Sequence, residues 1–232
     1  MNLEGIILAG GMGTRLSSVW SEGPKPMAPI NGKPFLEILL ESLFKKGFSR
    51  VIMAVSYKHE QISSYFGSRY KTIEIEYVVE ESPLGTGGAI LEGMSQAISD
   101  HVYVFNGDTF LDFEVVKIEK LWLNNSLPIM VLKKVFDGSR FGAVEISSGL
   151  IGSFSEKVMS CETLINAGCY VLPKNIFDEV SVENSFSFEK EFLPQYIKNN
   201  SMLGFITEGI FIDIGIPGDY KLAQELLGDL CN

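Results

Sequence analysis

Two short motifs near the N-terminus have the residue types and spacing to bind a triphosphate. The first is residues 8–16, LAGGMGTRL, after an apolar run, and the second is residues 23–27, GPKPM. Glycines let the backbone turn sharply and approach an anion, and successive N–H groups in such a turn form an anion site. Arg15 adds a permanent forked charge, and the prolines beside Lys25 stiffen the backbone that aims its ammonium group.

The spacing of the first motif disfavours the two common phosphate-binding loops. A dinucleotide-binding G-x-G-x-x-G pattern needs a third glycine at the position of Leu16. A Walker motif needs Gly-Lys-Ser/Thr four residues after a glycine, and the sequence has no such triplet.

The compound pattern L-A-G-G-x-G-T-R-L followed by P-K-P resembles the sugar nucleotidyltransferase family. This resemblance implies transfer of a nucleoside monophosphate to a sugar 1-phosphate, release of pyrophosphate, and Mg²⁺ as cofactor. It is greatest for members that use GTP and a heptose 1-phosphate to make bacterial surface glycans, although the residues alone indicate only a hexose-like sugar. It covers nearly the whole chain, including residues 25–29, 33–37, 54–59, 106–110, 164–168 and 211–217.

The resemblance also implies roles for charged residues. Arg15 would hold the leaving β- and γ-phosphates, and Lys25 would bridge the α-phosphate and the incoming sugar phosphate. Asp108 and Asp213 match the family's metal-binding aspartates, and Mg²⁺ needs few carboxylates when phosphate oxygens complete its ligands. The catalytic candidates are therefore Arg15, Lys25 and Asp108, and the metal-ligand candidates are Asp108 and Asp213.

Asp108 ends the apolar run VYVFNGD over residues 102–108. Asn-Gly pairs often form hairpin turns, but residues 109–113 show no clear pairing-strand pattern. We therefore expect Asp108 at the carboxyl end of a buried strand, facing the same crevice as the glycine-rich motif. The nucleotide-binding candidates are Leu8, Ala9, Gly10, Gly11, Met12, Gly13, Thr14, Arg15, Lys25, Glu80, Gly85, Thr86, Asn106 and Gly107.

Residues 80–89, EESPLGTGGA, resemble the family's base-binding loop, in which glutamine is common at the position of Glu80. A carboxylate can accept both N1–H and N2–H of guanine, whereas it faces the carbonyl oxygens of uracil or thymine unfavourably. Glu80 therefore favours GTP, with Gly85 offering a backbone contact. A shift of one residue in the match would give this role to Glu81.

The sugar end of the site is predicted on three further segments. Gly142, in the Arg-Phe-Gly triplet 140–142, leaves room for a sugar ring, and Glu156 and Asn166 can bond ring hydroxyls. Lys157 would neutralise the sugar phosphate as a compact charge. The family usually has proline after this lysine, where the chain has Val158. Without the resemblance, residues 156–157 would be an ordinary solvated ion pair.

Strand patterns and helix patterns alternate in the first half of the chain, and these elements must position the residues named above. This alternation indicates a Rossmann-like, three-layer α/β/α fold with a mostly parallel central sheet. After residue 127, closer strands at 129–135, 143–146, 150–154 and 165–172 indicate a small added β region, with helices at 188–198 and 218–227. In the first half we expect strands at 5–9, 51–55, 74–79 and 102–105, and helices at 34–46, 59–66 and 87–98.

Bulk properties narrow the function classes. The 232 residues fit a single domain over 1–232, with no appended hexapeptide-repeat domain. A net charge of −10 argues against nucleic acid or an anionic membrane as partner. The cysteines lack C-x-x-C spacing, and no signal peptide or membrane span is indicated, so we expect reduced thiols in a cytoplasmic protein, with Cys169 in the core.

Three alternatives share the phosphate-handling residues or the fold. A mannose 1-phosphate guanylyltransferase differs in the sugar pocket, and a uridylyl- or thymidylyltransferase differs in the base. A non-catalytic sugar-nucleotide sensor would be free to lose the charged residues that clamp the leaving group. The aromatic residues Phe186, Phe188 and Phe192 fit a core or a contact surface better than a base-stacking platform. The apolar terminal helix fits either a cover over the core or the interface of a homo-oligomer (Leu222, Ala223, Leu226, Leu227).

Overall fold

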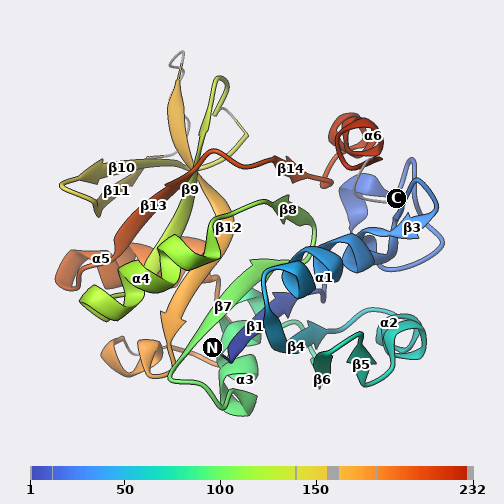
Figure 1. The fold of residues 1–232 in the computed structure, drawn as a ribbon, viewed down its shortest axis with the longest axis horizontal. Helices are drawn as coiled ribbons and strands as arrows, with labels where there is room; N and C mark the ends of the chain where they lie inside the picture. The colour runs from blue at the N-terminus through green and yellow to red at the C-terminus, as the bar shows by residue number, and fades with distance from the viewer. Residues whose placement is uncertain (1, 12, 139, 156–161, 181, 229–232) are drawn as a thin grey trace.

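The longer strands of this protein join in one sheet. In the computed structural model, which describes residues 2–11, 13–138, 140–155, 162–180 and 182–228, this sheet has ten strands (Figure 1). From edge to edge they are β10 (Ala143–Ser147), β11 (Leu150–Ser155), β13 (Leu203–Thr207), β9 (Ile129–Val135), β12 (Thr163–Pro173), β7 (His101–Asn106), β1 (Leu3–Leu8), β4 (Phe48–Val55), β6 (Ile73–Val79) and β5 (Arg69–Tyr70).

The central strands β7, β1, β4 and β6 run parallel. Successive side chains of a strand point to opposite faces, so Ile7 and Met53 join one hydrophobic cluster, whereas Ile6 and Ile52 join another. Because both faces are covered, these strands are apolar almost throughout. The strands and helices expected in the first half are confirmed, with small shifts at their ends.

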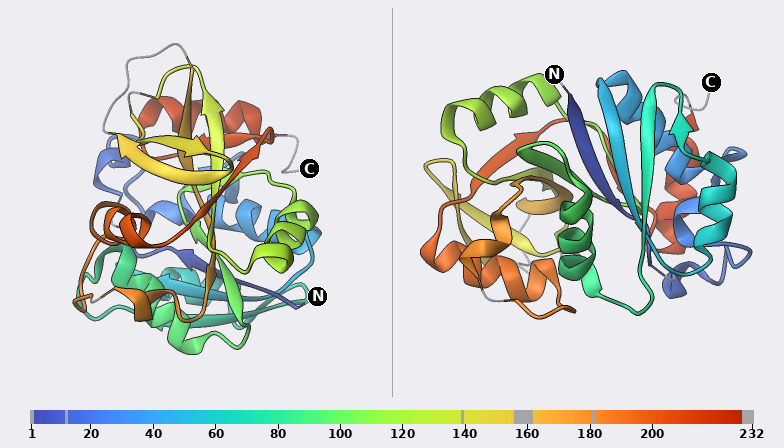
Figure 2. Two further views of the ribbon diagram at one scale, coloured as in Figure 1. Left: turned by 90° about the vertical axis from the view of Figure 1, so that its left-hand side faces the viewer. Right: turned by 90° about the horizontal axis from the view of Figure 1, so that it is seen from below.

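Helices cover both faces of the sheet and make three layers (Figure 2). Apolar side chains of α1, α2 and α4 belong to the first cluster, and those of α3 and α5 belong to the second. The expected α/β/α fold is thereby confirmed; α4 was not expected. The helices are α1 (Phe35–Lys45), α2 (His59–Phe66), α3 (Gly85–Gln96), α4 (Val115–Asn125) and α5 (Leu193–Asn199).

The second half of the chain extends the sheet with antiparallel neighbours. β12 runs antiparallel to β7 on one side and to β9 on the other, and β10 pairs antiparallel with β11. The expected added β region is therefore confirmed as a continuation of the central sheet. β13, which was not expected, lies parallel to β9.

A second, two-stranded sheet joins distant parts of the chain. β8 (Thr109–Leu111) pairs antiparallel with β14 (Phe211–Asp213), so residues 109–111 form a strand although their pattern did not indicate one. Strands of three residues are too short to show a period of two. Since β8 pairs with β14, the turn at Asn106-Gly107 does not close a β7–β8 hairpin.

The helix expected at 188–198 is split. It begins as the π-helical turn η4 (Phe188–Phe192) and continues as α5. Pro194 in the first turn of α5 has no N–H to bond an earlier carbonyl, which accounts for the break in regular helix. The remaining elements are η1 (Thr14–Leu16), η2 (Lys25–Met27), β2 (Pro29–Ile30), β3 (Lys33–Pro34), η3 (Ile176–Glu179) and α6 (Pro217–Leu226).

The core contains the residues expected there. Cys169 is buried, and Phe186, Phe188 and Phe192 pack in the second cluster. The terminal apolar residues divide between two roles: Ala223 and Leu227 are buried, whereas Leu222 and Leu226 are exposed. One side of α6 therefore covers the core. Within the described ranges, every helix is too short or too polar to cross a membrane.

Candidate functional site

A cavity of about 570 Å³ opens where the four parallel strands end. Leu8 and Asn106 are the last residues of β1 and β7, while Ser56 and Glu80 directly follow β4 and β6. Ligands of open α/β sheets bind at this edge. The lining residues are Leu8, Gly10, Gly11, Lys25, Pro26, Ser56, Tyr57, Glu80, Pro83, Gly85, Thr86, Ala89, Asn106, Gly107 and Asp108.

The glycine-rich motif forms the wall next to β1. Ala9 is buried, and its N–H donates to the Ala54 carbonyl at 2.7 Å, which prolongs the pairing of β1 with β4. A Cβ on Gly10 would lie 2.8 Å from Glu80 Oε1. Gly13 has a φ of +64° and passes so close to Lys25 that a Cβ would lie 2.7 Å from that residue's Cβ. The motif therefore packs against two charged side chains.

Only part of the glycine-rich motif, residues 8–16, lines the cavity. Leu8, Gly10 and Gly11 line it, whereas Ala9 and Gly13 are not among its lining residues. Arg15 belongs to η1 and also does not line the cavity, and its side chain is exposed. Thr14 belongs to the same element. Met12 lies outside the described residues.

Lys25 joins two aspartates that are distant in the sequence. Pro24, with a φ of −65° and a ψ of 147°, leads into η2, and the Lys25 side chain is only 7% exposed. Its Nζ donates to Asp108 Oδ2 and lies 3.9 Å from Asp213 Oδ1. The pairing of β8 with β14 places Asp213 opposite Thr109, next to Asp108. The structure therefore brings these three predicted residues together.

The two carboxylates are arranged in a way that suits a divalent cation. Burial and the charge of Asp108 raise the pKa of Asp213, while Lys25 and the Gly215 N–H, which donates to Asp213 Oδ1 at 2.6 Å, oppose this rise. A cation would relieve the repulsion between the carboxylates, and their oxygens are the donors that Mg²⁺ prefers. Across the described ranges, no three His, Cys, Asp or Glu residues form a metal cluster. Mg²⁺ usually takes one or two carboxylates together with phosphate oxygens and waters.

Glu80 is held at the start of α3. The Leu84 N–H donates to Glu80 Oε2 at 3.2 Å, and Leu84 is the N-cap residue of that helix. The positive end of a helix dipole favours a carboxylate at this position. Burial nevertheless raises the pKa of Glu80, with partial opposition from the Leu84 N–H. Glu80 lines the cavity, whereas Glu81 is exposed and is not among the lining residues.

Five lining residues were not predicted as site residues: Pro26, Pro83 and Ala89 lie within predicted motifs, whereas Ser56 and Tyr57 lie outside them. Ser56 and Tyr57 directly follow β4. Tyr57 is 43% exposed, and Lys58 Nζ lies 5.2 Å from the centroid of its ring. The rule that ligands meet the carboxyl ends of parallel strands could have identified both. A half-exposed aromatic ring in a cavity offers a face on which a flat base can stack.

Neither Asn166 nor Gly142, the two sugar-side candidates that the structure describes, is among the residues that line this cavity. Asn166 lies in a bulge of β12, and Gly168, with a φ of +68°, packs against Asn106, where a Cβ would lie 2.6 Å from Nδ2. The bulge therefore meets the end of β7. Gly142 is exposed with open space around it. Glu156 and Lys157 lie outside the described residues.

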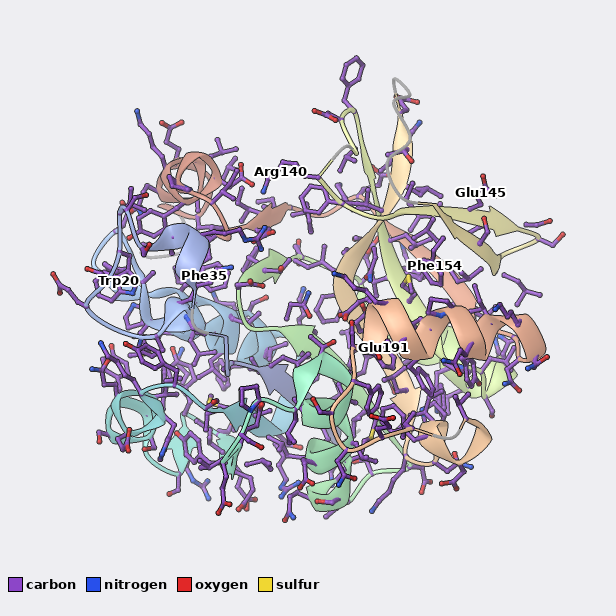
Figure 3. All side chains as sticks on the ribbon, turned by 180° about the vertical axis from the view of Figure 1, so that it is seen from behind. Trp20, Phe35, Arg140, Glu145, Phe154 and Glu191 are labelled. Atoms are coloured by element: carbon purple, nitrogen blue, oxygen red, sulfur yellow. The ribbon has the colours of Figure 1, made fainter. Side chains whose placement is uncertain are left out.

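Arg140 connects the segment before β10 to α6. Its Nη1 donates to Asp219 Oδ2 at 2.5 Å, and Figure 3 shows it on the side of this β region that faces α6. The charge of Arg140 also opposes the rise in the pKa of Asp213. A cation held by Asp219 therefore lies within electrostatic range of the Asp213 carboxylate.

A lysine shared by two carboxylates beside a glycine-rich turn suits the transfer of a phosphate-linked group between two anions, because it can neutralise charge on both. With the three-layer sheet, this chemistry defines an α/β enzyme that handles nucleotides. The chain belongs to the nucleotidyl transferase family, which it matches over residues 4–229.

Within this family, the chain is similar to two heptose 1-phosphate guanylyltransferases and to one protein of known crystal structure. A D-glycero-α-D-manno-heptose 1-phosphate guanylyltransferase from Campylobacter jejuni is 47% identical, covering 94% of this chain and 97% of that one. An enzyme of the same name from Aneurinibacillus thermoaerophilus is 42% identical, covering 97% of this chain and 98% of that one. Crystal structures of HddC from Yersinia pseudotuberculosis, one of them complexed with GMP-PN, have TM-scores of 0.87 and 0.86 at 36% identity, covering 97% of this chain and 99% of theirs.

Proposed function

We propose that this protein transfers GMP from GTP to D-glycero-α-D-manno-heptose 1-phosphate, forming GDP-heptose and pyrophosphate for bacterial surface glycan synthesis. The observation that carries the proposal is the meeting of Glu80, Lys25, Asp108 and Asp213 at one edge of the sheet. It occurs in a chain that aligns over nearly its full length with heptose 1-phosphate guanylyltransferases.

The chemistry needs little proton transfer. The oxygen of the sugar phosphate already carries negative charge near neutral pH, so it can attack the α-phosphorus of GTP without a general base. The barrier is the repulsion between two anions and the charge that develops on the departing pyrophosphate. Positioning and charge neutralisation therefore carry catalysis.

Lys25 is the residue best placed to bridge the two anions. Its ammonium group is buried beside the glycine-rich turn, and its present partners are the carboxylates of Asp108 and Asp213. These aspartates would hold Mg²⁺, which supplies positive charge to phosphate oxygens when it is bound. Lys25 would then donate to the α-phosphate and the sugar phosphate. Arg15, exposed in η1, would reach the leaving β- and γ-phosphates as GTP fills the cavity.

Base selection depends on Glu80 and the residues around it. Its carboxylate, anchored by the Leu84 N–H, would accept N1–H and N2–H of guanine. Tyr57 would stack on the base. Gly85 and Thr86 would offer contacts from the start of α3, while Asn106 and Gly107 would line the side nearer the sugar.

The acceptor would bind on the side of β12. Asn166 and Glu156 would bond sugar hydroxyls, Lys157 would neutralise the sugar phosphate, and Gly142 would leave room for the ring. Use of Mg²⁺ in particular, a cytoplasmic location and assembly into a homo-oligomer also belong to this proposal. Exposed Leu222 and Leu226 on α6 are consistent with such an assembly.

The deciding experiment measures pyrophosphate release with Mg²⁺ for five nucleotides, GTP, UTP, dTTP, CTP and ATP, each with heptose 1-phosphate or mannose 1-phosphate. Mass spectrometry of the product identifies the nucleotide sugar, and removal of the metal with EDTA followed by its return tests the cofactor. We expect turnover with GTP and heptose 1-phosphate.

Other outcomes redirect the proposal. Preference for mannose 1-phosphate would retain the base assignment and reject the sugar. Preference for UTP or dTTP would mean that Glu80 does not read the base. Binding of a nucleotide sugar without turnover of any pair would indicate a sensor that has kept the fold.

A further inference from the structure

The half-buried carboxylate of Glu189 lies outside the cavity and contacts Thr86, which belongs to the loop of residues 80–89, here called the nucleotide loop. Thr86 Oγ1 donates to Glu189 Oε2 at 2.6 Å, and Ser187 Oγ donates to the same oxygen at 3.4 Å. The Phe188 N–H in turn donates to Thr86 Oγ1 at 2.9 Å. Thr86 lines the cavity, whereas Glu189 belongs to η4.

The second oxygen of Glu189 reaches the sugar side. Tyr170 Oη donates to Glu189 Oε1 at 3.5 Å and accepts from Asn166 Nδ2 at 2.5 Å. The Gly168 N–H donates to Asn166 Oδ1 at 3.0 Å. Burial and the charge of Glu189 raise the pKa of Tyr170 well above its usual value, so its hydroxyl stays protonated and remains a donor.

Within this series of hydrogen bonds, from Thr86 through Glu189 and Tyr170 to Asn166, the donor and the acceptor of each bond are determined. Backbone N–H groups can only donate, so Phe188 and Gly168 orient the two ends, and an ionised carboxylate can only accept. Thr86 must therefore give its proton to Glu189, which leaves it an acceptor toward the cavity. Tyr170 must likewise donate its proton to Glu189, so toward Asn166 it can only accept. This fixes the Asn166 amide with Nδ2 toward Tyr170 and Oδ1 toward Gly168.

Backbone packing keeps Glu189 next to the loop. The Gly87 N–H donates to the Phe186 carbonyl, and the Phe186 N–H donates to the Leu84 carbonyl, each at 2.9 Å. A Cβ on Gly87 would lie 2.1 Å from the Phe186 ring. The start of α3 and the segment before η4 therefore behave as one unit.

We propose that Glu189 is a positioning residue. It holds the nucleotide loop, through Thr86, at a fixed position relative to the bulge of β12 that starts at Asn166, which it reaches through Tyr170. This inference rests on the proposed function of the site. Glu189 touches neither reacting group; it sets the orientation of side chains on both sides of the bond that is made.

The test compares Glu189→Gln and Tyr170→Phe with the unaltered enzyme. The glutamine amide keeps one acceptor oxygen and places an NH2 donor where the other oxygen was, so it cannot accept from Thr86 and Tyr170 at the same time, although the size of the side chain is kept. The phenylalanine removes only the sugar-side arm from a residue that is fully buried. We expect KM for the sugar 1-phosphate to rise about tenfold in both variants. KM for GTP should rise in Glu189→Gln alone.

Two variants are matched controls. Glu191→Gln changes a carboxylate of the same turn, labelled in Figure 3, which accepts from the Ser187 N–H at 2.6 Å. Tyr103→Phe removes another buried tyrosine hydroxyl, which donates to Glu119 at 2.7 Å far from the cavity. Both should retain the KM values of the unaltered enzyme. Equal rises in KM in a control and in its counterpart would overturn the inference.

Hydrogen exchange in the ligand-free protein gives a readout that needs no substrate. Glu189→Gln should speed exchange at the Gly168 amide, although residue 189 does not contact it directly. Unchanged exchange there would overturn the inference even if the enzyme is active. Absence of turnover in the unaltered protein would instead reject the proposed function, and faster Gly168 exchange would still support the link.

Discussion

At the scale of single residues, the site depends on charges that are buried together. Lys25 is almost fully buried, and an ammonium group tolerates such burial only with compensating partners. Asp108 and Asp213 supply them. Arg15 is exposed instead, so its charge is available to a ligand without a cost of burial. The two cations therefore differ in what their removal should do to the fold.

Removal of the charge of Arg15 or of Asp108 should abolish most catalysis. We expect Arg15→Ala and Asp108→Asn each to slow pyrophosphate release by about 10²–10³-fold, the usual effect of one group that stabilises developing charge. Thermal melting should show Arg15→Ala within about 0.5 kcal/mol of the unaltered stability, because its side chain is exposed. A rate within a few-fold of the unaltered enzyme would contradict the assigned role.

Glu80→Gln should change the choice of base. The amide keeps one acceptor but turns a donor toward guanine, so kcat/KM for GTP should fall about 10–100-fold, and UTP and dTTP should gain relative to GTP. Since burial raises the pKa of Glu80 above 4.5, activity with GTP should fall as the pH drops through a value above 4.5, as the carboxylate is protonated. The glutamine variant should lack this acidic limb.

Competition assays with mixed nucleotides measure this preference, and Glu81→Gln is the control because its side chain is exposed and does not line the cavity. If both substitutions shift the preference equally, the base is not read by Glu80.

At the scale of elements, short contacts between segments determine which side chains meet. β8 and β14 have only three residues each, yet their pairing places Asp213 beside Asp108. The start of α3 is equally constrained. Gly85 has a φ of +70°, and a Cβ on it would lie 2.4 Å from the Phe186 carbonyl oxygen. The glycines of this loop thus serve close packing as well as ligand access.

Gly87→Ala should destabilise the protein by about 1–3 kcal/mol, the range for forcing a methyl group into a packed site. The added Cβ would overlap the Phe186 ring, which is itself buried. Urea unfolding measures the change. Gly218→Ala, in α6 with open space around it, is the matched control and should be neutral or slightly stabilising because alanine favours helix. Equal effects at both positions would show that backbone preference, rather than overlap, determines the cost.

At the scale of the whole molecule, charge balance affects both binding and stability. With a net charge of −10, the protein must attract anionic substrates through local groups such as Lys25 and Arg15. Far from the cavity, Glu119 of α4 is buried and accepts from Tyr103, with His101 Nε2 at 3.2 Å. Burial alone would raise the pKa of Glu119, but these partners outweigh it and hold the pKa below 4.5.

The stability of the whole chain should therefore depend on Glu119 in acid. A carboxyl whose pKa is lower in the folded state stabilises the fold above its unfolded value, near 4.5, and this contribution is lost as the pH falls through the folded value. Glu119→Gln should cost roughly 1–3 kcal/mol at pH 7 and much less below the folded pKa. Urea unfolding from pH 7 downward tests this, and a cost that does not change with pH would contradict it.

Local chemistry and periodicity made much of this protein predictable. Glycines, prolines and alternating apolar runs act within a few residues, so the sequence indicated the first-half strands, helices α1 to α3 and the motifs around Lys25, Glu80 and Asp108. Because parallel strands end at one edge, it also indicated that these motifs meet. The single domain over residues 1–232 and the sugar-side residues remain predictions.

Tertiary structure decided what depends on contacts between distant segments. The pairing of β8 with β14 and the link from Thr86 through Glu189 to Asn166 each join residues whose own neighbours carry little signal. A three-residue strand has almost no periodicity, and a glutamate in a turn resembles a solvated surface residue. Only packing, which brings the partners within hydrogen-bond distance, gives such residues a defined role.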